Sequence, residues 1–379
     1  MKARTLVPTS FVMYLKFIII VGALLATVFA APSKAQDMSP SDLFHAAAQA
    51  NSSYALGASY AFGQDPPVTM TAGPTTKRGS VAVADTARWH IGSISKSFTS
   101  TLVMRLVERG ELDLDAPVEQ YLAAYNDSMH SDWKAISLRQ LLSHTAGLPA
   151  SAPRRITNET YEHEPYEGRR AVLSAMWSSP LNGETGNFLY SNIGYVLAGL
   201  IVEEILGVSW EEAILSEVSV PLGLFSLGFG APRQSDAANG HQSILGFRRT
   251  VSPENPASDN PRWMGPAGTI HLSMADLVRW GQMHLAACGG HIQDYLTQAS
   301  CRAMQTPIAS DYGLGWVIQN PDTSGPTVWH NGSNMMWYAM LLIAPEHELV
   351  VAVATNVYTP EPIDRLTLEL TTALVNSRE

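Results

Sequence analysis

Segments with the composition of β-strands lie at both ends of this 379-residue chain, and segments with helical patterns lie between them. Because the early and late strands need partners, we expect the two ends of the chain to complete one sheet around a helical middle. Apolar and β-branched residues bounded by turn residues predict these strands at 53–62, 68–72 and 79–84, and again at 312–317, 326–332, 336–343 and 348–355.

Helical spacing of apolar residues, with capping and stop signals, predicts the helices. The most regular helix runs from about Ser93 to Arg109 and ends at Gly110. Another begins at the capping-box pair Ser209 and Glu212 and runs to about residue 218. The other expected helices cover residues 137–144, 171–178, 192–206, 273–287 and 363–376, whereas the polar stretches 150–168 and 231–263 are expected to be mainly loops.

The first 35 residues have the pattern of a bacterial export signal. Basic residues precede an apolar run from Phe17 to Ala31, and small residues follow it up to Ala35. That run is short for a membrane-spanning helix, which needs about 20 residues. We expect cleavage near Ala35, leaving residues 36–379 as a periplasmic or secreted protein without a stable membrane anchor. Retention of the segment as an N-terminal anchor is the alternative.

Composition limits which partners and cofactors are expected. The formal net charge is −10, and nucleic acids and anionic membranes bind basic proteins, so neither is an expected partner. The two cysteines, Cys288 and Cys301, could form a disulfide in an oxidising compartment or remain free thiols. The histidines are scattered and form no His-Glu-x-x-His motif, so no metal cofactor is expected.

Ser93 and Lys96 are three residues apart at the start of the most regular helix, and therefore share one face. A buried lysine has a lowered pKa and can take the proton of a serine hydroxyl, which makes the serine a nucleophile. The alternative is a capping serine beside a solvated lysine. The same spacing recurs at Ser131 and Lys134, in what the sequence predicts to be a surface turn.

Two later motifs carry compatible chemistry. Tyr190-Ser191-Asn192 offers a phenol that could transfer protons and an amide that could position a substrate, although a packed aromatic and a helix cap explain it equally well. His330-Asn331-Gly332 lies in an expected strand. There the imidazole could bind a carboxylate or an acyl oxygen, the glycine lets a substrate approach, and the next N–H, of Ser333, could stabilise an oxyanion.

The order of the three motifs resembles that of the penicillin-recognising serine hydrolases, which include class C β-lactamases, D-alanyl-D-alanine carboxypeptidases and related carboxylesterases. The resemblance extends from about residue 53 to the last expected helix. Further matching segments are Leu138-Arg139-Gln140-Leu141-Leu142-Ser143-His144-Thr145-Ala146-Gly147-Leu148, Phe188-Leu189-Tyr190-Ser191-Asn192-Ile193-Gly194-Tyr195 and Pro266-Ala267-Gly268-Thr269.

The resemblance implies an α/β (α+β) fold in which an antiparallel sheet is flanked by helices and an all-helical lobe is inserted in mid-chain. The sheet lobe would comprise about 50–92 and 265–379, the helical lobe about 93–264, and the active site would lie between them. Ser93 would be the nucleophile, and Lys96 and Tyr190 the proton-transfer pair. Substrate would contact Asn192, His330, Gly332 and Ser333, with the Ser93 and Ser333 N–H groups forming the oxyanion hole.

One departure from the family bears on the substrate. Lactamases and peptidases of this family usually have Lys-Thr-Gly where this chain has His330-Asn331-Gly332. An imidazole in place of an always-charged ammonium makes recognition of a substrate carboxylate pH-dependent and weakens the case for efficient hydrolysis of penicillins or cephalosporins. A peptide, an ester and a lactam therefore all remain candidate substrates. A non-catalytic or very slow acyl-binding sensor is the alternative of a different class, whereas the absence of Gly-x-Ser-x-Gly argues against an α/β-hydrolase.

Overall fold

The computed structural model describes residues 38–77, 79–181, 183–234, 237–244, 247–320 and 325–378. The expected export signal, residues 1–35, lies outside the described residues. The strands are β1 Leu56–Phe62, β2 Val68–Ala72, β3 Arg88–His90, β4 Gly228–Phe229, β5 His241–Ile244, β6 Phe247–Thr250, β7 Ile270–Ser273, β8 Val317–Gln319, β9 Thr327–Ser333, β10 Tyr338–Ala344 and β11 Leu349–Thr355.

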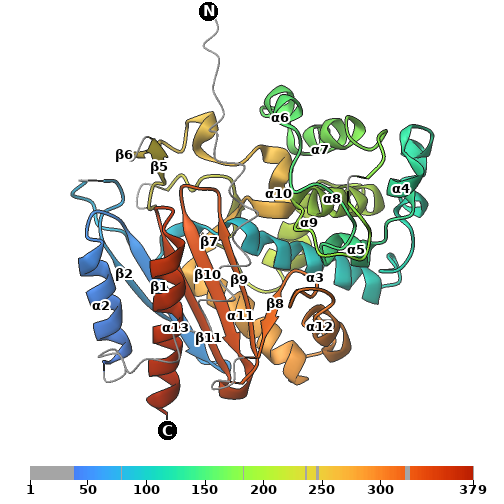
Figure 1. Cartoon of the computed structure of the whole chain (residues 1–379). Helices are drawn as coiled ribbons and strands as arrows, with labels where there is room; N and C mark the ends of the chain where they lie inside the picture. Colours follow the sequence, from blue (N-terminus) through green and yellow to red (C-terminus); the bar gives the residue numbers. More distant parts are fainter. Residues whose placement is uncertain are drawn as a thin grey trace, which may run out of the picture.

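The α-helices connect and cover these strands (Figure 1). Those before residue 209 are α2 Pro40–Ala50, α3 Ser95–Glu108, α4 Ser131–Lys134, α5 Leu138–Leu142, α6 Arg154–Thr160, α7 Pro165–Ser174 and α8 Asn192–Leu206. The later ones are α9 Trp210–Ile214, α10 Gly265–Gly268, α11 Met274–Gly289, α12 Gln298–Met304 and α13 Pro360–Asn376. Short helical turns include η3 Gly92–Ile94, η4 Val118–Gln120, η5 Ala123–Ser128, η6 Leu215–Ser219, η7 Pro256–Ser258, η8 Arg262–Met264 and η9 Pro345–His347.

The main sheet has six strands in the order β2-β1-β11-β10-β9-β8, and every neighbouring pair is antiparallel. β1 lies beside β11, with Leu56 opposite Thr355 and Phe62 opposite Leu349. The predicted fold class is therefore confirmed: an antiparallel sheet flanked by helices, closed by segments from both ends of the chain.

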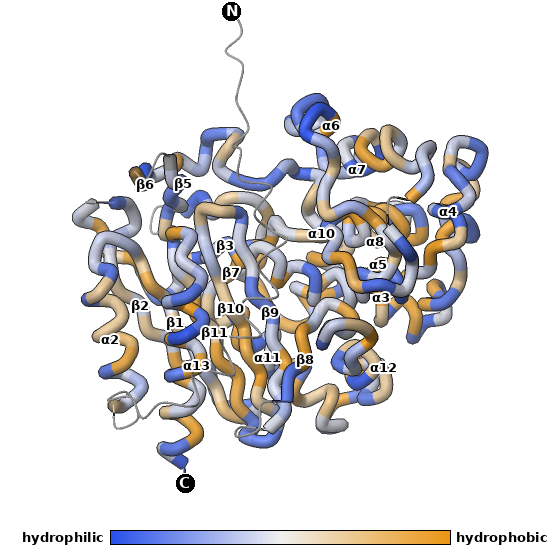
Figure 2. The backbone as a smooth tube through the Cα atoms, in the orientation of Figure 1, coloured by the Kyte–Doolittle hydropathy of each residue, from blue (hydrophilic) through white to orange (hydrophobic). Residues whose placement is uncertain are grey.

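The central strands β10 and β11 are covered on both faces. All seven residues of each strand are buried, which explains why their sequences are continuous apolar runs rather than alternating ones. α13 and α2 pack on one face, and α11 packs on the other. Figure 2 shows the hydrophobic colour along these strands and the hydrophilic colour on the outer loops.

The helical part of the protein lies beside this sheet, and α8 runs through the centre of the helical part (Figure 1). α8 is apolar on all sides and buried over its first twelve residues, as a core helix should be. It ends, as predicted, at Gly207, whose φ of +68° is a left-handed helix cap. Within the ranges described above, no single helix is long and apolar enough to span a membrane. α8 and Trp210–Ser219 reach that length and hydropathy only together, and the two are bent by 81° relative to each other.

Three expectations about elements were wrong. The polar stretch 150–168 contains α6 and the start of α7, because Ile156, Thr157 and Thr160 give α6 a buried face that its polar composition masks. Residues 79–84 make only the isolated bridge between Pro74 and Ala82 rather than a strand. The glycine-bearing segment 312–316 is not a strand either, and β8 begins only at Val317.

Candidate active site

Ser93 lies where a strand of the three-stranded sheet β3-β7-β4 gives way to a helix. The Ile91 N–H donates to the Ile270 carbonyl across this sheet, and Gly92 then turns the chain with a φ of +50°. That backbone conformation favours glycine. Ser93 therefore sits in η3 rather than in the first turn of an α-helix, and α3 begins two residues later at Ser95.

Lys96 is fully buried, and its side-chain nitrogen contacts three oxygens. Nζ lies 3.1 Å from Ser93 Oγ, 2.8 Å from Asn192 Oδ1 and 2.8 Å from the Ala267 carbonyl oxygen. Burial removes water from the charged form and holds the Lys96 pKa well below its ordinary value. The structure thus places Lys96 in direct contact with both Ser93 and Asn192.

Tyr190 and Asn192 flank Ser191, the N-cap of α8, whose hydroxyl accepts from the Gly194 N–H at 3.1 Å. This cap fixes where the chain enters the helix. Lys96 Nζ lies 4.8 Å from the centre of the Tyr190 ring. Tyr190 is only partly buried. The predicted Tyr-x-Asn motif is therefore at the same site as the Ser-x-x-Lys motif.

His330, on β9, is buried and has both ring nitrogens in contact with protein atoms. Nδ1 lies 2.5 Å from the Asn331 carbonyl oxygen, so it carries the proton, and Nε2 accepts from the Tyr312 hydroxyl at 3.0 Å. Burial and the nearby Lys96 lower the His330 pKa to about 3. His330 is accordingly a neutral imidazole at neutral pH.

Two glycines bring the backbone of β9 against the turn that carries Ser93. A Cβ atom at Gly332 would lie 2.0 Å from the Ile91 carbonyl oxygen and 2.4 Å from the Ser93 nitrogen. A Cβ atom at Gly92 would lie 2.1 Å from the Ser333 nitrogen. Only residues without side chains permit this approach. The backbone nitrogens of Ser93 and Ser333, predicted as an oxyanion hole, thus come from two directly packed segments.

His144 lies at the same site, where sequence reasoning assigned it no role. Its carbonyl accepts from the Leu189 N–H at 2.8 Å, and its Nδ1 accepts from the Ser191 N–H at 3.0 Å, so it holds the backbone on both sides of Tyr190. Its ring lies 4.2 Å from the Tyr190 ring. A φ of +61°, unusual for a residue with a side chain, allows both contacts.

With this geometry established, comparison with known proteins decides the family. The family model for Beta-lactamase matches residues 46–374, which is most of the chain. The chain belongs to the beta-lactamase family. The match includes all three motifs and confirms the relationship to the penicillin-recognising serine hydrolases that the sequence predicts.

Two curated relatives each match about three quarters or more of this chain. Penicillin-binding protein 4 of Amycolatopsis lactamdurans is 29% identical over 302 residues, which cover 76% of this chain and 77% of that protein. Protein flp of Staphylococcus aureus is 25% identical over 306 residues, which cover 79% of this chain but only 58% of the relative. The chain therefore matches little more than half of the staphylococcal protein.

Solved structures show the same fold. The octameric penicillin-binding protein homologue from Pyrococcus abyssi has a TM-score of 0.73 at 23% identity, over 88% of this chain and 76% of that one. The class C beta lactamase from Rhodobacter sphaeroides has a TM-score of 0.70 at 21% identity, over 90% of this chain and all of that one. Identities this low support the shared beta-lactamase fold alone.

Some contacts of this beta-lactamase-family site are invisible to motif reasoning. The Ala267 acceptor is a backbone carbonyl, so its side chain gives no signal, although Pro266–Thr269 resembles the family. Tyr312 lies in a segment read as a strand. His144 lies in the matching segment 138–148, and its place there was the only available signal. Across the described ranges, no three His, Cys, Asp or Glu side chains are grouped so as to hold a metal ion.

Proposed function

We propose that the protein is a serine hydrolase that cleaves an acyl ester or amide bond through a covalent acyl-Ser93 intermediate. The observation that carries the proposal is the buried Lys96 nitrogen 3.1 Å from Ser93 Oγ. A neutral lysine has two N–H bonds and one lone pair. Its two N–H groups would donate to Asn192 Oδ1 and the Ala267 carbonyl, which leaves the lone pair for the Ser93 proton.

The two chemical steps follow from this arrangement. As Lys96 takes the Ser93 proton, Oγ forms a bond to the substrate carbonyl carbon, and the carbonyl oxygen becomes an oxyanion between the Ser93 and Ser333 N–H groups. The bond to the leaving group then breaks, and a proton passes to that group from Lys96 or Tyr190. Water attacks the acyl-serine by the same route and releases the acid.

The hydrogen bonds and lowered pKa of His330 favour substrates that carry no carboxylate. Its ring is neutral, and both ring nitrogens already contact protein atoms, so it offers no cation to a substrate carboxylate. We therefore propose that neutral acyl esters and amides are better substrates than penicillins, cephalosporins or D-Ala-D-Ala peptides, which carry a carboxylate. Expected rates follow the order short-chain p-nitrophenyl ester, then peptide or lactam.

Export is part of the proposal. Cys288 on α11 and Cys301 on α12 form a disulfide, and disulfides persist in oxidising compartments. This supports the expectation that residues 1–35 direct the protein to the periplasm or the exterior. Intact-mass measurement of the protein recovered from its producing cell, with expected loss of residues 1–35, tests this directly.

The deciding experiment for the chemistry is intact-mass spectrometry with a fluorophosphonate, a penicillin, a p-nitrophenyl ester and a D-Ala-D-Ala peptide. We expect one fluorophosphonate adduct, on Ser93, and ester turnover that Ser93→Ala abolishes. Ser131→Ala, in the second Ser-x-x-Lys, is the matched control and should keep full activity. Residual activity of Ser93→Ala within about tenfold of wild type would overturn the nucleophile assignment. No adduct and no turnover would favour the acyl-binding sensor.

A further inference from the structure

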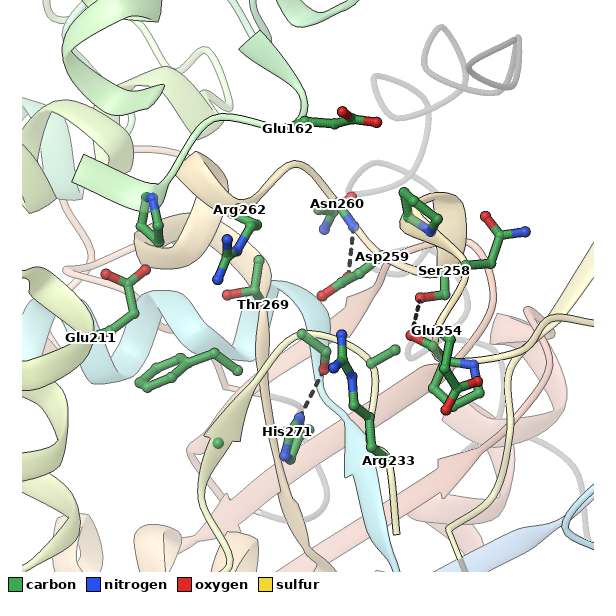
Figure 3. Close-up of a pocket in the computed structure, with 18 of the residues that line it drawn as sticks. Glu162, Glu211, Arg233, Glu254, Ser258, Asp259, Asn260, Arg262, Thr269 and His271 are labelled. Atoms are coloured by element: carbon green, nitrogen blue, oxygen red, sulfur yellow. Dashed lines mark hydrogen bonds between the residues drawn. The ribbon is translucent and has the colours of Figure 1, made fainter. Parts of the chain in front are cut away.

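Asp259 lies outside the predicted site and is nearly buried, with 9% of its side chain exposed. It belongs to the loop between η7 and η8, which borders a cavity of about 890 Å³ (Figure 3). The residues that line this cavity do not include Ser93 or Lys96. Figure 3 shows Asp259 beside Asn260 on the inner side of this loop. One carboxylate oxygen, Oδ1, makes the contacts that follow.

The first contact leads to the nucleophile. Asp259 Oδ1 lies 2.7 Å from Nε2 of His90, which is fully buried at the end of β3. The other ring nitrogen, Nδ1, accepts from the Gly92 N–H at 3.1 Å. Because Nδ1 accepts, a neutral His90 carries its proton on Nε2, facing the carboxylate. Asp259 thereby contacts the ring whose other nitrogen accepts from the peptide N–H just before Ser93.

The second contact leads to the other oxyanion donor. Asp259 Oδ1 accepts from Nδ2 of Asn334 at 2.9 Å. Asn334 follows Ser333 directly, and its own Oδ1 accepts from the N–H groups of Met336 at 3.1 Å and Trp337 at 3.3 Å. Asn334 therefore organises the turn between β9 and β10. Asp259 thereby contacts the residue just after Ser333.

These contacts converge from three distant parts of the chain. We propose that Asp259 is a positioning residue for the oxyanion hole: its carboxylate sets the spacing between the Ser93 and Ser333 N–H groups through His90 and Asn334. The inference rests on the proposed acyl-serine chemistry. No side chain separates Gly92 from Gly332. Displacement of the donors by a fraction of an ångström weakens transition-state stabilisation more than substrate binding.

The test compares variants that keep or remove the acceptor. Asp259→Asn keeps an oxygen that can accept from both partners, whereas Asp259→Leu has similar size and no acceptor. We measure kcat and KM on a p-nitrophenyl ester, and Ki for an arylboronic acid, whose tetrahedral adduct on Ser93 places an oxygen in the oxyanion hole. Asp259→Leu should lower kcat about 10- to 100-fold and raise Ki in parallel, with KM changed less than about threefold. Asp259→Asn should have a kcat and a Ki close to those of the wild type.

Controls separate this inference from the proposed function and from instability. Glu254→Leu, in the segment just before η7, changes a residue that lines the same cavity and whose carboxylate accepts from Ser252 rather than from His90 or Asn334, and it should leave kcat and Ki unchanged. Ser93-dependent turnover with unaltered kcat and Ki in Asp259→Leu would overturn the inference and leave the proposed function intact. Thermal unfolding shows whether Asp259→Leu folds. If it does not fold, the test uses Asn334→Ala instead, and an unaltered Ki of the boronic acid in that variant would overturn the inference.

Discussion

At the scale of single residues, the site is built from basic groups whose charged forms are disfavoured by burial. Lys96 and His330 are surrounded by protein, and burial lowers the pKa of both. His144 is buried beside them, and its pKa is also held well below its ordinary value by burial and by Lys96. Because burial disfavours the charged form of Lys96, its side-chain nitrogen, 3.1 Å from Ser93 Oγ, is suited to accepting the Ser93 proton.

Replacement of Lys96 by arginine tests whether the neutral form matters. Arginine remains protonated at every working pH, so Lys96→Arg should place a permanent cation at the site and remove the base. We expect kcat/KM for ester hydrolysis to fall by about 10²- to 10⁴-fold, the usual contribution of a positioned base. Stopped-flow measurement of the acylation burst checks this. A variant with a burst rate near that of wild type would show that the cation, rather than the base, is required.

His144 is expected to act through the backbone contacts that flank Tyr190. Glycine accepts the φ of +61° but has no acceptor for the Ser191 N–H, whereas asparagine tolerates this φ and can place an oxygen near the position of Nδ1. His144→Gly should therefore lower kcat by about tenfold or more, and His144→Asn by much less. Ester turnover of the two variants checks the prediction, and their melting temperatures show whether both are folded at the assay temperature. Equal losses would contradict it.

At the scale of elements, the sequence signals that proved reliable were those with local causes. The Ser209 capping box lies where the local pattern predicts it, α8 covers the expected range 192–206, and α11 begins one residue after the expected start at 273. α6 was missed because its burial depends on neighbours rather than on its own apolar content. The short β3 was missed as well, although it carries the chain to Ser93.

Asp364 connects two elements, α13 and β10, and gives stability a pH dependence. Its carboxylate accepts from the Tyr338 hydroxyl at 2.6 Å, and burial raises its pKa to about 7. An unfolded aspartate has a pKa of about 3.9. A raised folded pKa means that its contribution to stability is full below about pH 4 and is lost as the pH rises to about 7.

Asp364→Asn should remove this dependence, because the amide oxygen can still accept from Tyr338 but has no charge to bury. Relative to wild type, the variant should gain free energy of unfolding as the pH rises from about 4 to about 7, on the order of a few kcal/mol, and show no further gain above that range. Urea unfolding of both proteins at pH 5, 6, 7 and 8 measures the difference. A difference that is independent of pH would contradict the assigned ionisation.

At the scale of the whole molecule, the sheet makes the two ends of the chain interdependent. β1 pairs with β11 along seven residues, and the Ala55 N–H donates to Asn356 Oδ1 at 2.8 Å, 301 residues away in sequence. The lobe boundaries, at about residues 92 and 265, remain predictions. The pairing nevertheless indicates that neither end has its full set of partners without the other.

A chain ending at residue 264 tests this interdependence. It would lack β11, the main partner of β1, and also α11 and α13, which cover the sheet. We expect the fragment 36–264 to show no cooperative unfolding transition in urea and no near-UV circular dichroism, unlike the chain 36–379. Addition of residues 265–379 by co-expression should restore both signals. A cooperative transition in the fragment alone would show that the helical part folds independently.

The sequence by itself determined the family, the fold class and the Ser93, Lys96, Tyr190 and His330 motifs, because these depend on residue type and spacing. Tertiary structure alone decided which atoms meet. The backbone carbonyl of Ala267 contacts Lys96, and the Tyr312 hydroxyl donates to His330. Asp259 lies between His90 and Asn334. These contacts join residues at least 18 positions apart in the sequence, and one of them uses a backbone atom, so no local pattern records them.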